Sequence, residues 1–156
     1  MTKFKKIFIS LTLFLFFLSC GYKPIFSKKS VNFNIGNIEF SGNKDVNNKI
    51  NYTLSNYKNK SDKAKTISLV ITNTKNITIA SKNSKGEAQT KRISIDANVK
   101  IILAKNSIVE KKFSKSSIYD VIERKSEQKS TENKLIENLS GEIAQQIILE
   151  ILKSIK

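Results

Sequence analysis

The apolar and polar residues of this chain alternate with different spacings in different segments, and each spacing predicts a different element. The clearest pattern runs from residue 92 to residue 103, where apolar and polar residues alternate one by one. Alternation over this length predicts a long antiparallel strand with one buried face. The apolar positions of this strand are Ile93, Ile95, Ala97, Val99, Ile101 and Leu103.

Three other segments alternate less regularly, and each predicts a further strand of the same sheet. Residues 31–40 alternate on both sides of Gly36 but change parity there, which indicates a β-bulge. Residues 65–80 predict a long strand with a polar interruption, and residues 109–121 predict a lysine-rich strand. Polar residues between these segments predict turns at 41–43, 81–86 and 104–107.

A helical pattern follows the first strand. Apolar residues recur every three or four positions between residues 46 and 57, which places them on one face of a helix. Asp45 precedes this stripe and is expected to be the N-cap. The stripe consists of Val46, Ile50, Leu54 and Tyr57.

A second helical pattern lies in the C-terminal part of the chain and predicts a helix of about 25 residues. Ser130 or Thr131 is expected to cap it, so that Glu132 lies in its first turn and favours the helix dipole. Residues 123–129 are charged and not periodic, so they are expected to precede the helix. The apolar stripe consists of Leu135, Leu139, Ile143, Ile147 and Ile151.

The order of these segments is strand, helix, three strands and helix, which predicts an α+β fold. Two amphipathic helices and one amphipathic sheet form a two-layer sandwich when both helices cover the same face of the sheet. We therefore expect two helices packed on one face of a four-stranded, mainly antiparallel sheet. The other face would present Ser, Thr, Asn and Lys to water or to a polar partner.

The N-terminal segment has the pattern of a bacterial lipoprotein signal. Lysines precede an apolar run from Ile7 to Leu18, which is shorter than the roughly 20 residues of a bilayer-spanning helix. Ser19 and Cys20 follow, and a small residue before a cysteine is the processing pattern at which a lipid is attached. We expect Cys20 to carry this lipid, with palmitate among its acyl chains. The alternative is a plain signal peptide or an uncleaved anchor whose cysteine is incidental.

The expected domains follow from that cysteine. Residues 1–19 would be the signal peptide, residues 20–30 a lipidated tether, and residues 31–156 a single domain. Several acyl chains on one residue suffice for stable membrane anchoring. Gly21 follows the cysteine where an Asp would indicate inner-membrane retention, so we expect the outer membrane, on its periplasmic side.

The charge of the chain favours an anionic partner. The sequence has 28 basic and 13 acidic residues, a net charge of +15. Three of these lysines lie in residues 1–19, which hold no acidic residue, so +12 remains after their removal. In the expected compartment the partner would not be nucleic acid but anionic lipid head groups or lipopolysaccharide phosphates.

The composition argues against an enzyme. There is no histidine, and the one cysteine is assigned to the lipid, which excludes most metal sites and the common nucleophilic triads. The five glycines form no phosphate-binding loop. We therefore expect no catalytic residue, no metal and no cofactor other than the covalent lipid.

Several short motifs, in order along the chain, resemble the LptE (RlpB) family of lipopolysaccharide-assembly lipoproteins. The segment Cys20-Gly21-Tyr22-Lys23-Pro24-Ile25-Phe26 is similar to the family's N-terminal motif. The later matches are Gly86-Glu87-Ala88-Gln89, Phe113-Ser114, Tyr119-Asp120 and Glu142-Ile143-Ala144-Gln145-Gln146-Ile147. The resemblance implies two helices on a four-stranded sheet.

The resemblance also implies partners and a site. The family's partner is the LptD-type outer-membrane β-barrel, whose polar lumen the lipoprotein plugs, and the resemblance implies that the protein binds lipopolysaccharide during its transport. Two groups of basic residues correspond to the family's lipopolysaccharide-binding positions. The first is Lys82 or Lys85, with Lys91 and Arg92 nearby in sequence, and the second is Arg124, Lys125 or Lys129. The other interpretation of each of these residues is an ordinary solvated side chain.

Two alternative functions stay open at this point. One is a generic envelope lipoprotein that binds a lipid or a cell-wall fragment, and a closed apolar cavity under the helices would favour it. The other is a purely structural envelope protein.

Overall fold

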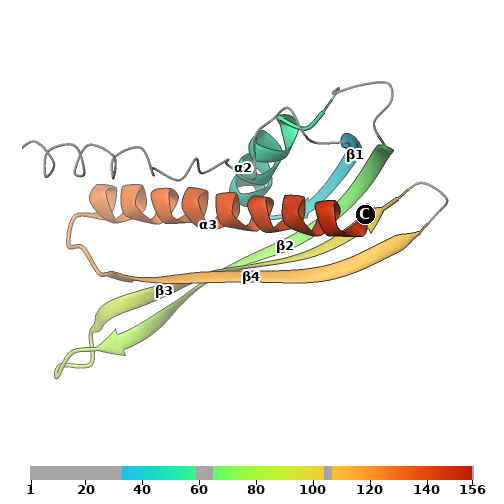
Figure 1. Ribbon diagram of the computed structural model, residues 1–156. Helices are drawn as coiled ribbons and strands as arrows, with labels where there is room; N and C mark the ends of the chain where they lie inside the picture. The colour runs from blue at the N-terminus through green and yellow to red at the C-terminus, as the bar shows by residue number, and fades with distance from the viewer. Residues whose placement is uncertain (1–32, 59–64, 104–106, 156) are drawn as a thin grey trace, which may run out of the picture. The chain divides into compact units, whose positions relative to one another are not determined.

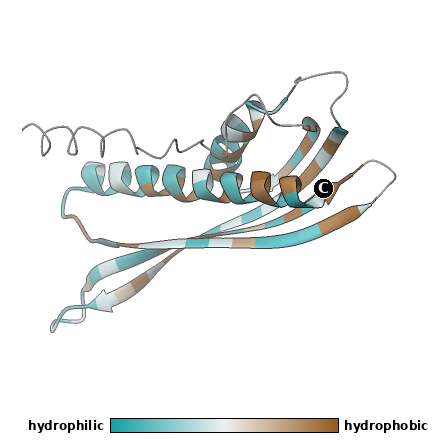
Figure 2. Ribbon diagram, viewed as in Figure 1, coloured by the Kyte–Doolittle hydropathy of each residue, from teal (hydrophilic) through white to brown (hydrophobic). Residues whose placement is uncertain are grey.

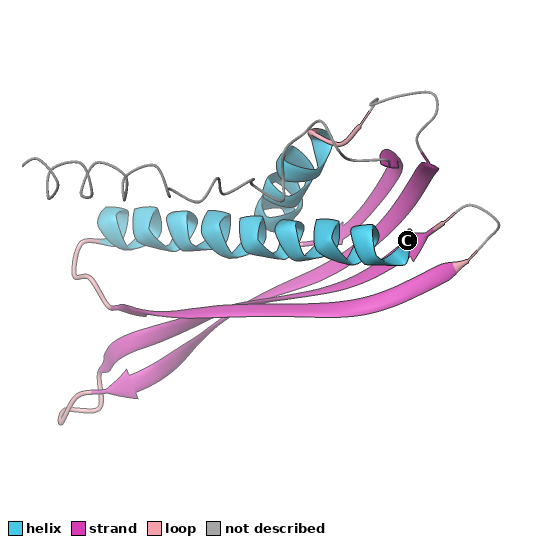
Figure 3. Ribbon diagram, viewed as in Figure 1, coloured by secondary structure: helices cyan, strands magenta, loops and turns pink. Residues whose placement is uncertain are grey.

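The computed structural model describes residues 33–58, 65–103 and 107–155 (Figure 1). The predicted signal peptide and tether lie outside the described residues. The described residues form two helices and four strands in the expected order, and Figure 3 colours them by type. The elements are β1 (Phe33–Gly42), α2 (Lys44–Ser55), β2 (Lys65–Lys82), β3 (Ala88–Ile102), β4 (Ile108–Asp120) and α3 (Lys125–Ser154).

The strands form one sheet in the order β1-β2-β3-β4. β2 pairs antiparallel with β3, and β3 with β4, while β1 pairs parallel with β2 because α2 carries the chain back between them. The register of β1 on β2 shifts between Ile35 and Ile38, which confirms the bulge predicted at Gly36. The α+β class and the mainly antiparallel sheet are therefore confirmed.

One face of the sheet is buried under both helices. The apolar residues of β3 from Ile93 to Ile101 are at most 1% exposed, as the alternation predicts, whereas Leu103 lies beyond the strand and is half-buried. α2 packs over β1 and β2, α3 packs over β3 and β4, and the two helices contact each other (Figure 1). The core therefore lies between one apolar sheet face and the apolar stripes of both helices.

The other face of the sheet is polar and exposed, as expected. Figure 2 shows the hydrophilic residues that alternate with apolar ones along the strands. Thr72 and Asn98 face outward, and Lys100 forms an exposed ion pair of 2.9 Å with Glu110 on β4. Exposed pairs of this kind contribute little to stability, so this face is held by backbone pairing rather than by its charges.

The start of α2 differs from the prediction. The side chain of Asn43, not of Asp45, is the N-cap, and its oxygen accepts hydrogen bonds from the N–H groups of Asp45 and Val46 at 3.1 and 3.2 Å. Asn and Asp are equally good caps, so the residue type could not decide between the two positions. Asp45 lies in the first turn, where its charge still favours the dipole. All four residues of the predicted stripe are buried.

α3 begins five residues before the earlier of its two predicted caps. The N-cap is Arg124, not Ser130 or Thr131, and the helix has 30 residues. Its first turns need no apolar stripe, because their side chains are exposed or half-buried. Gln128 helps to fix this end, since its side-chain oxygen accepts a hydrogen bond of 2.8 Å from the N–H of Ile122. The charged segment 123–129 is therefore mostly helical, contrary to the prediction.

The β2–β3 hairpin is longer than predicted. β2 continues without interruption to Lys82, so the expected loop at 81–86 is a tighter turn. The side-chain oxygen of Asn83 accepts hydrogen bonds from the N–H groups of Lys85 and Glu87, both at 3.0 Å. Gly86 has a φ of +83°, which favours glycine.

The end of β1 is fixed by a buried polar contact. Gly42 has a φ of +100°, and a Cβ at this position would lie 1.9 Å from the carbonyl oxygen of Asn73. Asn73 is 2% exposed. Its side-chain oxygen accepts a hydrogen bond from the N–H of Asn43, and its amide group donates to the carbonyl of Ser41 and to the side-chain oxygen of Asn47. This contact turns the chain from β1 directly into α2.

Candidate functional site

The first predicted basic group lies at the tip of the β2–β3 hairpin. Lys82 ends β2 and Lys85 lies in the turn, and both side chains are exposed. The Asn83 hydrogen bonds hold the turn in one conformation, so the two lysines project from a defined loop. The loop expected in this region is therefore the tip of the β2–β3 hairpin, and it carries both lysines.

The second predicted group lies at the same end of the molecule. Arg124 caps α3, and Lys125 and Lys129 lie in its first two turns. The N–H of Val121 donates a hydrogen bond of 3.0 Å to the carbonyl of Gln89, which places the start of α3 beside the start of β3. The structure thus brings both groups to one end of the sheet (Figure 1). We call this set the basic end: Lys82, Lys85, Lys91, Arg92, Arg124, Lys125 and Lys129.

Lys91 and Arg92 do not form one cluster with the hairpin tip. Consecutive residues of a strand point to opposite faces, and Lys91 pairs with Tyr119 on the buried face whereas Arg92 pairs with Ile118 on the outer face. Lys91 is half-buried and Arg92 is exposed. The two residues therefore lie on opposite faces of the sheet, and Lys91 belongs to the inner side of the domain.

Acidic residues reduce the charge of the basic end. The seven cations of this set and Lys75, whose charge also acts on Glu132, are accompanied by five acids, so the excess is +3. Arg124 is already engaged, because it lies 2.8 Å from the carboxylate of Glu127. Within the described residues, none of the exposed lysines of this end forms an ion pair. The five acids are Glu87, Asp120, Glu123, Glu127 and Glu132.

A hydrogen-bonded group joins α3 to the sheet at this end. The hydroxyl of Tyr119 donates to the carboxylate of Glu132 at 2.7 Å, and the amide of Gln128 donates to the same oxygen at 2.8 Å. These bonds lower the pKa of Glu132, in that order, and the charges of Lys91 and Lys75 lower it further against the effect of burial. Burial, followed by the Glu132 contact, raises the pKa of Tyr119.

Sequence reasoning missed this group. Glu132 was assigned to a first helical turn, and no partner was assigned to Tyr119 or Gln128. The one available signal was parity, since Tyr119 falls on the buried face of β4 and a buried phenol needs an acceptor. The group holds the N-terminal part of α3, with its basic residues, against the end of β4.

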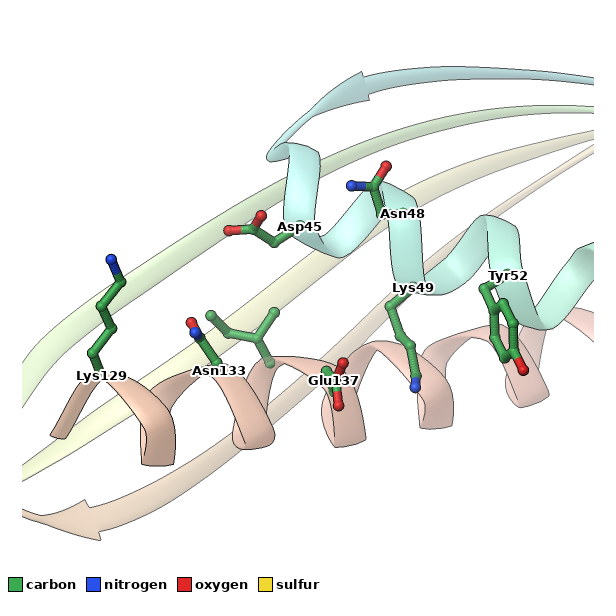
Figure 4. A pocket seen from close by; sticks show the side chains of 8 residues that line it. Asp45, Asn48, Lys49, Tyr52, Lys129, Asn133 and Glu137 are labelled. Atoms are coloured by element: carbon green, nitrogen blue, oxygen red, sulfur yellow. The ribbon is translucent and has the colours of Figure 1, made fainter. Parts of the chain in front are cut away.

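A groove of about 750 Å³ lies between α2 and α3 (Figure 4). Its charges are balanced, because Asp45 and Glu137 oppose Lys49 and Lys129. Lys49 lies 5.6 Å from the centre of the exposed ring of Tyr52. A groove with amides and both signs of charge can hydrogen-bond a polar ligand but does not favour a phosphate. The lining residues are Asp45, Asn48, Lys49, Tyr52, Lys129, Asn133, Ile136 and Glu137.

No helix in the described part of the chain is long and apolar enough to cross a membrane. Two helices on one face of a four-stranded sheet, with exposed cations at one end, define the class of the protein. It is a small α+β domain whose candidate site is a charged surface rather than a closed pocket.

The family model for lipopolysaccharide assembly, LptE, matches residues 33–151, and the chain therefore belongs to the LptE family. This finding confirms the resemblance seen in the motifs. No curated protein sequence matches the chain.

Solved structures share the fold. The crystal structure of the rare lipoprotein B from Shewanella oneidensis has a TM-score of 0.56 and 15% identity, and the match covers 76% of this chain and 96% of that one. The solution structure of lipoprotein B from Nitrosomonas europaea has a TM-score of 0.52 and 14% identity, over 75% and 81% of the two chains. A minor lipoprotein from Acinetobacter baumannii has a TM-score of 0.50 and 12% identity, over 71% and 86%.

Proposed function

We propose that this protein acts in lipopolysaccharide assembly as an outer-membrane lipoprotein, anchored by lipid on Cys20 and facing the periplasm. In this proposal the domain forms a complex with an LptD-type β-barrel, plugs its lumen, and binds lipopolysaccharide at the basic end. Membership of the LptE family supports the general role. The observation that supports the binding site is that two basic groups, far apart in sequence, lie toward the same end of the sheet.

The surfaces of the domain suit the two parts of this role. The outer face of the sheet is polar, and the lumen of a wide outer-membrane barrel is polar as well. The exposed lysines of the basic end can form charge-assisted hydrogen bonds with lipid phosphates. The groove between α2 and α3 is open and lined mostly by polar residues, so it does not favour a generic carrier of apolar lipid.

The test of the binding site is a charge substitution with a matched control. Lys82, Lys85, Arg124 and Lys125 are changed together to serine in the full chain, and binding to purified lipopolysaccharide in detergent micelles is measured at two ionic strengths. The control changes four exposed lysines outside the basic end and removes the same total charge. These are Lys65, Lys100, Lys112 and Lys153.

We expect the basic-end variant to bind lipopolysaccharide roughly tenfold more weakly than the wild type at low salt. The difference should be smaller at about 0.15 M salt, because salt then screens exposed charges that are more than about 8 Å apart. The control should lose much less. Equal binding of the basic-end variant and the wild type at both ionic strengths would show that these residues are solvated surface. Equal losses in the two variants would show that only net charge matters.

The barrel complex is tested separately. An affinity pull-down of the tagged full chain from detergent-solubilised outer membranes should recover a large β-barrel protein. The basic-end variant should recover it equally well, because we assign barrel contact to the polar sheet face. If no barrel is recovered from such membranes, the proposed plug role is contradicted, while the proposed lipopolysaccharide site is not tested by that result.

A further inference from the structure

β2 extends well beyond the strand that pairs with it on one side. The pairing of β1 with β2 ends at Gly42 and Asn73, but β2 continues to Lys82. Within the described residues, this part of β2 is paired only with β3, and Figure 1 shows the two strands continuing as a hairpin past the end of β1. One backbone edge of β2 is therefore open from Thr74 onward.

The open edge has a regular stretch of defined length. Pairing with β3 is continuous from Thr74 to Ile79, and the register shifts after Ile79. In an antiparallel pair, alternate residues direct their N–H and C=O groups away from the partner strand. Residues 74–79 therefore offer a short ladder of unpaired donors and acceptors, which ends at a bulge.

Apolar side chains accompany this ladder. Ile77 and Ile79 point to the face of the sheet that carries the helices, yet they are 41% and 53% exposed. α2 starts where β1 ends, so it covers the earlier part of β2 rather than this part. An added strand in this position would bury both isoleucines while completing the hydrogen bonds of the edge.

The opposite edge of the sheet is protected more strongly than this edge, which carries one inward-pointing charge, Lys75. β4 has inward-pointing lysines, and α3 covers it. Lys115 lies 2.9 Å from Glu142, and Lys111 lies 3.6 Å from Glu150. Charges that point inward on an edge strand are a common device against further pairing. The edge of β1 has its bulge at Gly36. Residues 74–79 therefore stand out as the receptive edge.

The surrounding charge indicates the chemistry of the partner. Lys75 and Lys82 lie on β2 itself, and Lys91 and Arg92 lie on β3 beside it. A second copy of this chain would bring the same cations to the same edge, with a net charge of +15 on each copy. Like charges at close range oppose such pairing. A segment with carboxylates next to its apolar residues complements the edge.

We propose that residues 74–79 of β2 bind an extended segment of an acidic protein partner as an added strand. Apolar side chains of that segment cover Ile77 and Ile79, and its carboxylates approach Lys75 and Lys91. This inference goes beyond the proposed function, because it concerns a protein segment and holds whether or not the basic end binds lipopolysaccharide.

The probe is a synthetic peptide of about eight residues in which valines alternate with threonines and glutamates. Its binding to the full chain is followed by fluorescence anisotropy, and protection of individual amides is followed by hydrogen exchange in NMR spectra. A second peptide carries N-methyl groups at alternate positions, so it keeps the side chains but cannot form the ladder. A third has lysines in place of the glutamates.

The matched variants test the side-chain part of the site. Ile77→Thr with Ile79→Thr keeps strand propensity and removes the apolar cover, and we expect roughly tenfold weaker binding. The control is Ile108→Thr with Ile118→Thr, which changes two isoleucines of similar exposure on the outer face of β4. Its affinity for the peptide should be unchanged.

Binding of the acidic peptide with protection of amides in 74–79, lost on N-methylation and weakened in the Ile77/Ile79 variant, supports the proposal. Protection confined to β4 or to the groove between the helices overturns it. So does equal affinity of the variant and the wild type, or no binding of the acidic peptide. If the lysine peptide binds as tightly as the acidic peptide, the proposal of an acidic partner is overturned. Self-association of the chain through 74–79 shows that a second copy is the occupant.

Discussion

The hydroxyl of Tyr119 on β4 donates a hydrogen bond of 2.7 Å to the carboxylate of Glu132 on α3. The bond joins the end of the last strand to the second turn of the last helix, across the connection that holds Arg124. Tyr119 is 8% exposed, so its hydroxyl needs an acceptor within the protein. The start of α3 is therefore held on the sheet by a specific polar contact rather than by apolar packing.

This contact predicts a dependence of stability on pH. The pKa of Glu132 is lowered in the folded state, mainly by the Tyr119 hydrogen bond, from an ordinary value of 4.5. The carboxylate therefore stabilises the fold above about that pH, and the stabilisation is lost as the pH falls through the lowered pKa. Tyr119→Phe should reduce the free energy of unfolding by about 1–3 kcal/mol at neutral pH and by less in acid.

Urea denaturation of the wild type and the variant between about pH 3 and about pH 7 measures both effects. Tyr52→Phe is the control, because Tyr52 is 70% exposed and its variant should match the wild type throughout. If the Tyr119→Phe variant lost the same free energy of unfolding at every pH, the pKa of Glu132 would not depend on the hydrogen bond from the phenol.

A charge in the middle of β3 should unfold the domain. Ala97 and Val99 are 0% and 1% exposed and face the helices. Ala97→Asp or Val99→Asp buries a carboxylate with no partner, which costs several kcal/mol and is comparable to the total stability of a domain. Asn98→Asp places the same group on the outer face and should change the melting temperature little. Melting of the Ala97 and Val99 variants at the wild-type temperature, followed by circular dichroism, would contradict the burial of these two positions.

Two glycines should respond to alanine in opposite directions. Gly42→Ala would place a Cβ against the carbonyl of Asn73 at a positive φ, so we expect a loss of at least about 2 kcal/mol. Gly141 lies inside α3 with nothing within 4 Å of an added Cβ. Gly141→Ala should stabilise the domain by about 0.5–1 kcal/mol. Thermal denaturation of both variants tests the pair, and destabilisation by the second would contradict the open space beside Gly141.

Cys20→Ala should abolish lipid attachment. The expectation rests on the apolar run that ends in Ser19-Cys20. Cells labelled with radioactive palmitate should incorporate it into the wild type and not into the variant, which should accumulate unprocessed or detached from the membrane. Equal palmitate incorporation into the wild type and the variant would show that Cys20 is not the lipidated residue.

The strands and the core could be predicted because they depend on local periodicity. Ile93 to Ile101 alternate so strictly that the strand and its buried face follow at once. The helix starts could not be predicted, because several residues near each start are competent caps. Asn43 and Asp45 are the clearest case, and only the position of Asn73 in space decides between them.

The basic site was predictable only in part. The lysines were visible as exposed charge, and their placement at a hairpin tip followed from the turn. That the start of α3 lies beside this hairpin depends on the bond from Val121 to Gln89, which no spacing reveals. The opposite orientation of Lys91 and Arg92 was implicit in the strand, since neighbouring residues alternate between faces.

The parallel pairing of β1 has a consequence for the order of folding. β2, β3 and β4 are neighbours in sequence as well as in the sheet, so they can form from their turns at low entropic cost. β1 pairs Phe33 with Lys65 across the whole of α2, so we expect it to join last. Until it does, the edge of β2 is open from Lys65 to Lys82. The strand nearest in sequence to Cys20 thus completes the domain.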